Sequence, residues 1–163
     1  MERTYWHKQT VDKPLFPDLL WSRPQNRQTA GKLLIVGGNV HGFAAAGEAF
    51  MEAQAAGIGT ARVLLPDVLQ KVVGGHFETA EYAPSTPAGS FSQAALAAAL
   101  EQAAWADAAL IAGDLGRNSE TAIFFEKFLS KYNGLTILTK DAGDYAINVA
   151  QQTLKRPDTY LVI

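Results

Sequence analysis

The sequence predicts an α/β fold, in which a mainly parallel β-sheet lies between helices on both of its faces. From residue 32 onward, short apolar runs alternate with alanine-rich or amphipathic stretches, and glycine or proline separates most of them. Such alternation is typical of right-handed βαβ units, which place successive strands parallel in one sheet. Ligands of such sheets bind outside the carboxyl ends of the strands, so the loops there are the candidate site.

Six segments have the character of strands. A buried parallel strand is a short, continuous apolar run closed by a turn signal. Residues 32–36 end in Gly37 and Gly38, and residues 60–65 are closed by Pro66. The other predicted strands span 78–82, 108–112, 135–138 and 159–163.

Helices are predicted between these strands. Residues 43–56 are rich in good helix formers, and Gly57 ends the segment. Ser92 is a candidate N-cap, and Ile123, Phe124, Phe128 and Leu129 form the expected apolar side of a later helix. The remaining predicted helices span 66–73, 92–104, 119–131 and 145–154.

Two parts are predicted along the chain: an N-terminal arm, residues 1–31, and an α/β domain, residues 32–163. The arm contains Pro14, Pro17 and Pro24, so it is expected to run extended over the domain surface. Trp6 and Trp21 are expected to pack on the domain, with a neighbouring subunit as the alternative. The apolar final strand predicts a fragment truncated at its C-terminus, with an unusual complete protein as the alternative.

Composition narrows the function classes. The 163 residues include no cysteine, which excludes disulfides, thiolate metal sites and cysteine nucleophiles. A formal net charge of −2 gives no reason to expect nucleic acid as a partner. Because the sequence has neither a membrane-length apolar run nor a signal-peptide core, we expect a cytoplasmic protein without a membrane partner.

The first candidate loop, residues 37–42, follows a strand and precedes a helix. Its glycines allow close approach of an anion, and the helix N-terminus offers free N–H groups. The spacing matches neither the dinucleotide fingerprint nor a P-loop, and Asp67 lies beyond the end of the second strand. Ligand contact is predicted, with a tight turn as the alternative. His41 is expected to face solvent, and no metal site is predicted from His7 or His76.

Two later loops carry charged residues. In the loop after strand 108–112, Asp114 and Arg117 could contact a polar ligand, or Asn118 could simply cap the next helix. In residues 140–144, Asp141 and Asp144 could bind hydroxyls or a metal-bound phosphate. They could also start the next helix, where aspartate is favourable.

Taken in order, these loops resemble the ADP- or ATP-dependent NAD(P)H-hydrate dehydratases of the ribokinase-like superfamily. The resemblance spans residues 23–163. Asn26–Gly31 stands where the family has H-K-G-x-x-G, and Gly37–Asn39 where it has G-G-S. The later matches are residues 57–61 to G-A-G-L-V, 111–117 to G-P-G-L-G, and 141–144 with Asn148 to D-A-D-A-L-N.

The resemblance implies a ribokinase-like three-layer fold and the nucleotide-dependent repair of hydrated nicotinamide nucleotides. It also implies ADP or ATP with Mg²⁺, and a homo-oligomer. No catalytic residue is assigned, because the family's T-P-H-x-x-E and G-T-G-D segments are not in this chain and its later half holds most of the nucleotide. The substrate-binding residues that it implies are Gly37, Gly38, Asn39, Ala45, Asp114, Gly116, Arg117, Asp141 and Asn148.

Departures from the family pattern keep two other functions open. Ala44 and Ala45 replace a G-A pair, Asp114 places a charge where the family has none, and Gly143 replaces an aspartate. One alternative is a ribokinase-like kinase of a small hydroxylated substrate, such as a sugar or hydroxymethylpyrimidine, for which Asp141 would suit hydroxyl recognition. The other is a degenerate homologue that binds a nucleotide or a protein without catalysis.

Overall fold

The structure, a computed structural model, describes residues 10, 12, 16–18, 22–74 and 77–162. Within these residues a single sheet has six strands, all parallel, in the order β3-β2-β1-β4-β5-β6. The predicted α/β class and parallel sheet are therefore confirmed. The strands are β1 (Lys32–Gly37), β2 (Thr60–Pro66), β3 (Ala80–Ala83), β4 (Ala108–Ala112), β5 (Leu135–Leu138) and β6 (Thr159–Leu161).

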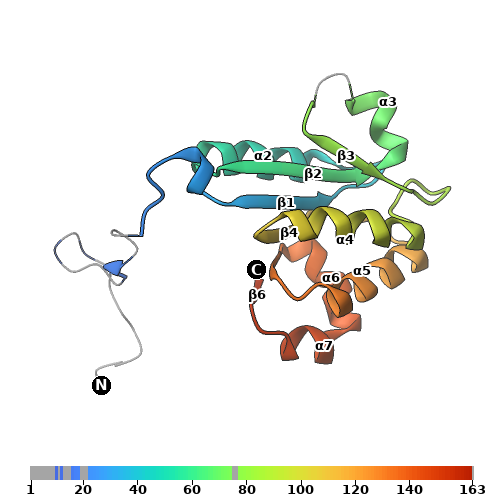
Figure 1. The fold of residues 1–163 in the computed structure, drawn as a ribbon. Helices are drawn as coiled ribbons and strands as arrows, with labels where there is room; N and C mark the ends of the chain where they lie inside the picture. Colours follow the sequence, from blue (N-terminus) through green and yellow to red (C-terminus); the bar gives the residue numbers. More distant parts are fainter. Residues whose placement is uncertain (1–9, 11, 13–15, 19–21, 75–76, 163) are drawn as a thin grey trace.

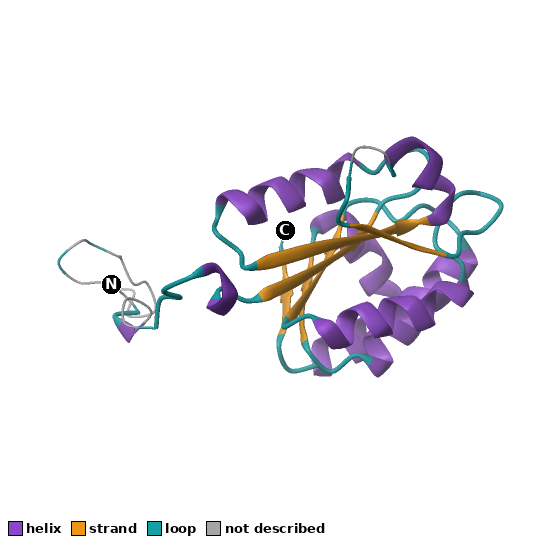
Figure 2. Ribbon diagram, turned by 45° about the horizontal axis from the view of Figure 1, so that its top comes forward, coloured by secondary structure: helices purple, strands orange, loops and turns teal. Residues whose placement is uncertain are grey.

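Helices connect the strands, as Figure 1 shows. The 3₁₀ turn η1 (Arg27–Thr29) precedes β1, and the following connections contain α2 (Ala44–Ala55), η2 (Asp67–Leu69), α3 (Gln70–Val73), η3 (Gln93–Ala95), α4 (Leu96–Trp105), α5 (Ser119–Lys131), α6 (Lys140–Asn148) and α7 (Ala150–Lys155). In Figure 2 the sheet lies between two helix layers. Helices α2 and α3 pack on one face, over β1, β2 and β3, while α4, α5 and α6 pack on the other.

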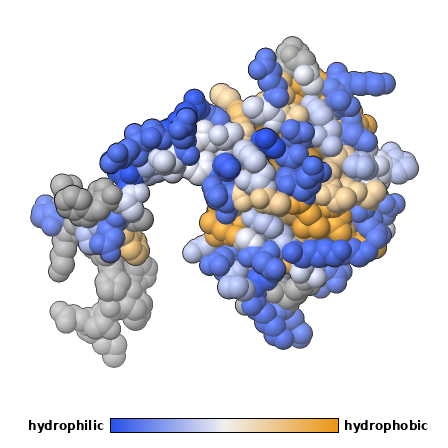
Figure 3. Space-filling model, in the orientation of Figure 1, coloured by the Kyte–Doolittle hydropathy of each residue, from blue (hydrophilic) through white to orange (hydrophobic). Residues whose placement is uncertain are grey.

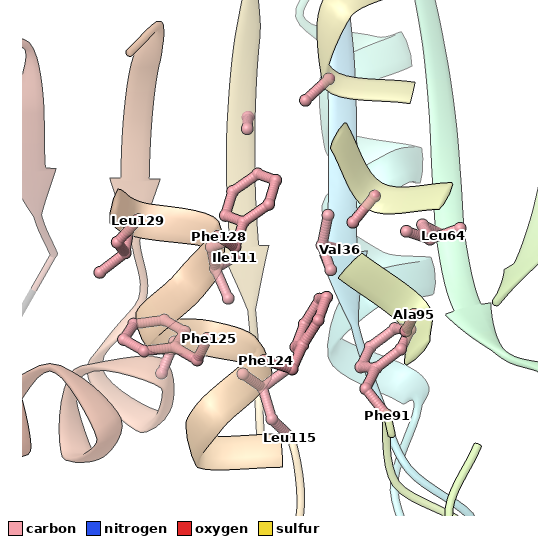
Figure 4. Close-up of a cluster of buried hydrophobic side chains, with 14 of the residues drawn as sticks. Val36, Leu64, Phe91, Ala95, Ile111, Leu115, Phe124, Phe125, Phe128 and Leu129 are labelled. Carbon is pink, nitrogen blue, oxygen red and sulfur yellow. The ribbon is translucent and has the colours of Figure 1, made fainter. Parts of the chain in front are cut away.

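The larger core lies on the side of α4, α5 and α6 (Figure 4). Phe91 stacks on Phe124 with ring centroids 5.1 Å apart, and Phe128 continues the row. Burying one such ring is worth about 1.5–3 kcal/mol relative to leaving it exposed. This cluster therefore anchors α5 and the loop before α4, the two segments that flank the loop after β4.

Two details of the predicted helices are wrong. Ile123 is 38% exposed, while Phe125 takes the place expected for it on the buried side of α5. Helix α6 begins at Lys140 instead of residue 145, and the helical stretch is interrupted at Val149. Thr139 has the extended backbone of an N-cap, and Asp141 lies in the first turn, where a carboxylate is favourable. Asp141 and Asp144 therefore lie at the start of a helix, which is the alternative that the sequence left open for them.

Of the two predicted N-cap residues, one caps its helix with its side chain and the other does not. Asn118 caps α5, since its side chain accepts a hydrogen bond from the Glu120 N–H at 2.8 Å. Ser92 occupies the N-cap position of η3, but its hydroxyl donates to the Pro84 carbonyl at 3.0 Å. Pro14, Trp6 and Trp21 of the arm, like His7 and His76, lie outside the described residues. The division into arm and domain stays a prediction.

The surface facing the viewer in Figure 3 is largely polar, with an apolar area over the alanine-rich α4. In the part of the chain that the structure describes, no helix is both long enough and apolar enough to cross a membrane.

Candidate functional site

The loops after β1 and β4 lie side by side at the point where the strand order reverses. From β1 the chain proceeds to β2 and β3 in one direction, and from β4 to β5 and β6 in the other. Gly37 at the end of β1 pairs with Ala112 at the end of β4. A Cβ on Gly37 would stand 2.2 Å from the Ala112 carbonyl oxygen, so only glycine fits there. In open α/β sheets this reversal is where ligands bind.

Asn39 joins these two loops. Its side-chain amide donates to the Asp114 carbonyl at 3.0 Å, and its amide oxygen accepts from the His41 N–H at 2.8 Å. The residue is 2% exposed. Both ends of the amide are thus engaged with backbone groups, and Asn39 positions the loops.

A third loop, residues 84–92 after β3, packs against both. The Val40 N–H donates to the Gly89 carbonyl at 2.9 Å, and a Cβ on Gly116 would stand 2.1 Å from the Ser90 hydroxyl. Asp67, which follows β2, accepts from the Ser85 N–H at 3.0 Å. The sequence identifies residues 84–89 only as a loop, because nothing in their composition shows which neighbours they contact.

A polar pocket of about 530 Å³ opens at the C-terminal ends of β4 and β5. Five of the nine predicted substrate-binding residues line it: Asp114, Gly116, Arg117, Asp141 and Asn148. The other lining residues are not among those that the sequence assigns to the substrate, and these are Asn118, Ser119, Asp144 and Tyr145. Asp144 is a candidate acid by sequence, whereas Ser119 and Tyr145 carry no signal there beyond their place in helices.

The other four predicted substrate-binding residues do not line the pocket. Gly37, Gly38 and Asn39 are buried, and Gly38 has a φ of +85° with Phe43 Cβ 3.0 Å from its would-be Cβ. Ala45, at the start of α2, faces Gly113, whose would-be Cβ lies 2.6 Å from the Ala45 Cβ. These contacts shape the loops, and direct ligand contact by the four residues stays a prediction.

Hydrogen bonds fix the wall of the pocket. The Asp114 carboxylate accepts from the Gly116 N–H at 2.7 Å, and the Tyr145 hydroxyl donates to the Gly116 carbonyl. Burial, assisted by the nearby Asp114 charge, raises the pKa of Tyr145, while a hydrogen bond with the Asn118 backbone and the Arg117 charge oppose the change. The Gly113 N–H donates to the Thr139 hydroxyl at 3.0 Å, which ties the loop after β4 to the start of α6.

The charge of the pocket limits what it can bind. Three aspartates face one arginine, which gives a formal charge of −2. Carboxylates accept hydrogen bonds from hydroxyls and amides and attract cations, but they repel phosphate. No group of three or more His, Asp or Glu residues among those described could hold a metal ion. By its charge, the pocket therefore favours a hydroxylated group over a phosphate.

Helix α6 separates this pocket from an apolar one. The second cavity, of about 300 Å³, lies between α6, α7 and the ends of β5 and β6. Asp144 lines both cavities. The apolar lining includes Leu138, Ile147, Leu161 and Val162.

The six parallel strands with helices on both faces form an α/β fold that matches a ribokinase-like fold. A ribokinase-like superfamily protein of Enterococcus faecalis shares it at a TM-score of 0.62 and 16% identity, over 85% of this chain and 48% of that one. A hypothetical protein of Streptococcus mutans does so at a TM-score of 0.56 and 21% identity, over 85% of this chain and 49% of that one. The chain thus spans about half the length of these two proteins. No family model and no curated protein matches the sequence.

Proposed function

We propose that this chain is the substrate-binding half of a nucleotide-dependent dehydratase that repairs hydrated nicotinamide nucleotides. The main support is that Asp114, Arg117, Asp141 and Asn148 line one polar pocket. They come from two separate parts of the sequence, the loop after β4 and helix α6, and the resemblance to the hydrate dehydratases assigns all four to the substrate. Their position beside the strand-order reversal agrees with ligand binding in α/β sheets.

The pocket chemistry suits the uncharged part of such a substrate. Ribose hydroxyls and a hydrated nicotinamide ring present O–H and N–H donors, which carboxylates such as Asp141 and Asp144 accept. Asn148 can donate to and accept from a carboxamide, and Arg117 can bond its oxygen. The excess of carboxylates directs the phosphates of the substrate away from this pocket. The groups that would expel the hydroxyl are expected in the family's later segments, which this chain does not contain.

Ligand-dependent stabilisation tests the proposal. Hydrated NADH should raise the Tm of the protein, whereas NADH should raise it less. Asp141→Asn removes one charged acceptor, so it should weaken binding of hydrated NADH by roughly 10- to 100-fold. Glu101→Gln, the same loss of charge on the exposed side of α4, should leave affinity unchanged. Equal affinity of both variants and the parent would remove the pocket from consideration as the substrate site.

A kinase acting on a small hydroxylated molecule is the second candidate. The three carboxylates of the pocket favour it, since aspartates bind sugar hydroxyls equally well. The same thermal measurement with a sugar panel and hydroxymethylpyrimidine separates the two, because only one class of ligand should stabilise the protein in a manner sensitive to Asp141→Asn. Binding of hydrated NADH by the native protein without any turnover would instead favour a non-catalytic homologue, for which Asp114 is the motivating residue.

A further inference from the structure

The polar pocket has two walls of different charge. The loop wall, formed by the loop after β4 and the start of α5, consists of Asp114, Gly116, Arg117, Asn118 and Ser119. The helix wall, formed by α6, consists of Asp141, Asp144, Tyr145 and Asn148. Among these lining residues the Arg117 guanidinium is the one positive group. An anion that enters the pocket would therefore bind at the loop wall.

A carboxylate of the chain itself already occupies a donor of the loop wall. The Gly116 N–H donates to the Asp114 carboxylate at 2.7 Å, and both residues line the pocket. The 13-residue helix α5 begins at Ser119 of the same wall, so the positive end of its dipole lies there. A backbone N–H beside a helix N-terminus and an arginine suits a phosphate oxygen. Asp114 therefore holds the donor that such an oxygen would use.

The backbone around Asp114 is fixed by its neighbours. Its carbonyl accepts from the Asn39 side-chain amide at 3.0 Å, and Asn39 is 2% exposed. Leu115, the next residue, is 0% exposed, and the Gly116 carbonyl accepts from the Tyr145 hydroxyl. Because these contacts hold the loop, only a rotation of the exposed Asp114 side chain would release the Gly116 N–H.

We propose that Asp114 determines the specificity of the pocket, because it makes the loop wall select a free hydroxyl group and reject a phosphate. A carboxylate accepts several hydrogen bonds, so Asp114 can accept one from a ligand hydroxyl as well as the one from Gly116. The same negative charge repels a phosphate at this wall. For its ligand the inference rests on the proposed function: the ribose hydroxyls of hydrated NADH enter the pocket, and the pyrophosphate stays outside it.

The other two acids of the pocket act through their charge alone. Asp141 and Asp144 lie on the helix wall. Removal of either one lowers the negative charge of the pocket by one and leaves the Gly116 N–H bonded to Asp114. Removal of Asp114 lowers the charge by the same amount and also frees this N–H beside Arg117. A comparison of the two walls therefore separates the role of Asp114 from the total charge.

Binding of inorganic phosphate, measured by phosphorus NMR titration and by thermal shift, tests the proposal. Asp114→Ala should raise the affinity for phosphate by about tenfold or more over the parent, because a repulsion is lost and a charge-assisted hydrogen bond is gained. Asp144→Ala, the matched control on the helix wall, should raise it by at most about threefold. The double variant Asp114→Ala, Arg117→Ala should lose the gain, which places the bound phosphate at the loop wall.

A second pair of variants keeps the test decisive if Asp114→Ala folds poorly. Asparagine removes the charge but keeps an acceptor for the Gly116 N–H, so Asp114→Asn should raise phosphate affinity less than Asp114→Ala does, and more than Asp144→Asn does. Equal gains at positions 114 and 144 would overturn the proposal, because the total charge would then set the selection. So would the absence of phosphate binding in every variant, or a gain that survives the loss of Arg117.

This titration and the test of the proposed function fail separately, because it uses phosphate and no hydrated NADH. A phosphate gain in Asp114→Ala, together with a parent that does not bind hydrated NADH, would support the role of Asp114 and overturn the dehydratase proposal. A parent that binds hydrated NADH, together with no phosphate gain in Asp114→Ala, would support the dehydratase proposal and overturn the role of Asp114.

Discussion

Side chains at the C-terminal edge of the sheet are held mainly by backbone groups of neighbouring loops. Asn39 illustrates this, since its side-chain amide donates to the Asp114 carbonyl and accepts from the His41 N–H. From the sequence, an asparagine after a glycine pair is compatible with two roles, binding a ligand or positioning the loop. The resemblance to the hydrate dehydratases assigns Asn39 to the substrate. The positioning role depends on the approach of the loop after β4, a contact between residues 75 positions apart that the sequence does not show.

The same substitution at two glycines should have opposite effects on stability. Gly116 has a φ of +88°, and its would-be Cβ lies 2.1 Å from the Ser90 hydroxyl. Gly143 lies within α6 with nothing within 4 Å of its would-be Cβ. Gly116→Ala should lower the free energy of unfolding by about 1–3 kcal/mol, while Gly143→Ala should raise it by about 0.5–1 kcal/mol. Urea unfolding measures both, and a stabilising Gly116→Ala would show that the loop contacts are misplaced.

Tyr145 should make stability depend on alkaline pH. Burial raises its pKa above the ordinary 10.0, so the folded protein holds the phenol proton more tightly than the unfolded chain does. The resulting stabilisation is fully present below about pH 10 and is lost as the pH rises through the raised pKa. Tyr145→Phe should lose the hydrogen bond to Gly116, and its stability should fall less steeply above about pH 10 than that of the parent. Unfolding curves from about pH 8 to about pH 11 test this, and parallel slopes would contradict it.

At the scale of elements, the ends of helices and strands are harder to predict than their existence. Strands β4 and β5 and helix α5 have the predicted bounds, because each is a strong apolar or amphipathic pattern between turn residues. The predicted start of α6 is wrong, since Gly143 and two aspartates are typical of a loop. In the structure the helix begins after Thr139, which is its N-cap residue. The Thr139 hydroxyl also accepts a hydrogen bond from the Gly113 N–H, a contact that depends on the neighbouring strand β4.

Arg156 should be essential for joining the end of α5 to the strands beside it. Its guanidinium donates to the carbonyls of Leu129, Tyr132 and Gly134, and to the hydroxyls of Thr136 and Thr159. Lysine keeps the charge but cannot reach several acceptors with a rigid fork. Arg156→Lys should therefore lower the free energy of unfolding by about 1–3 kcal/mol. Arg117→Lys, at an exposed position in the polar pocket, is the control and should leave stability unchanged in the same thermal or urea titration.

At the scale of the molecule, the sequence predicts the class, the parallel sheet and the location of the site. These follow from local patterns repeated along the chain. The convergence of Asp114, Arg117, Asp141 and Asn148 also follows, because carboxyl ends of parallel strands share one edge. The unequal cover of the two faces is not predictable in this way. Leu110 and Ile111 are both apolar, and their different surroundings arise from where the crossover helices pack.

These adjacent residues should reveal the asymmetry of the sheet in a single comparison. Ile111 is 1% exposed beneath α4 and α5, so Ile111→Ala leaves a cavity and should cost about 2–5 kcal/mol. Leu110 is half-buried on the opposite face of β4, where water already reaches part of the side chain, so Leu110→Ala should cost about 1 kcal/mol. Urea unfolding of both variants measures the difference between the two costs, and equal costs would show that the two faces of β4 are equally well covered.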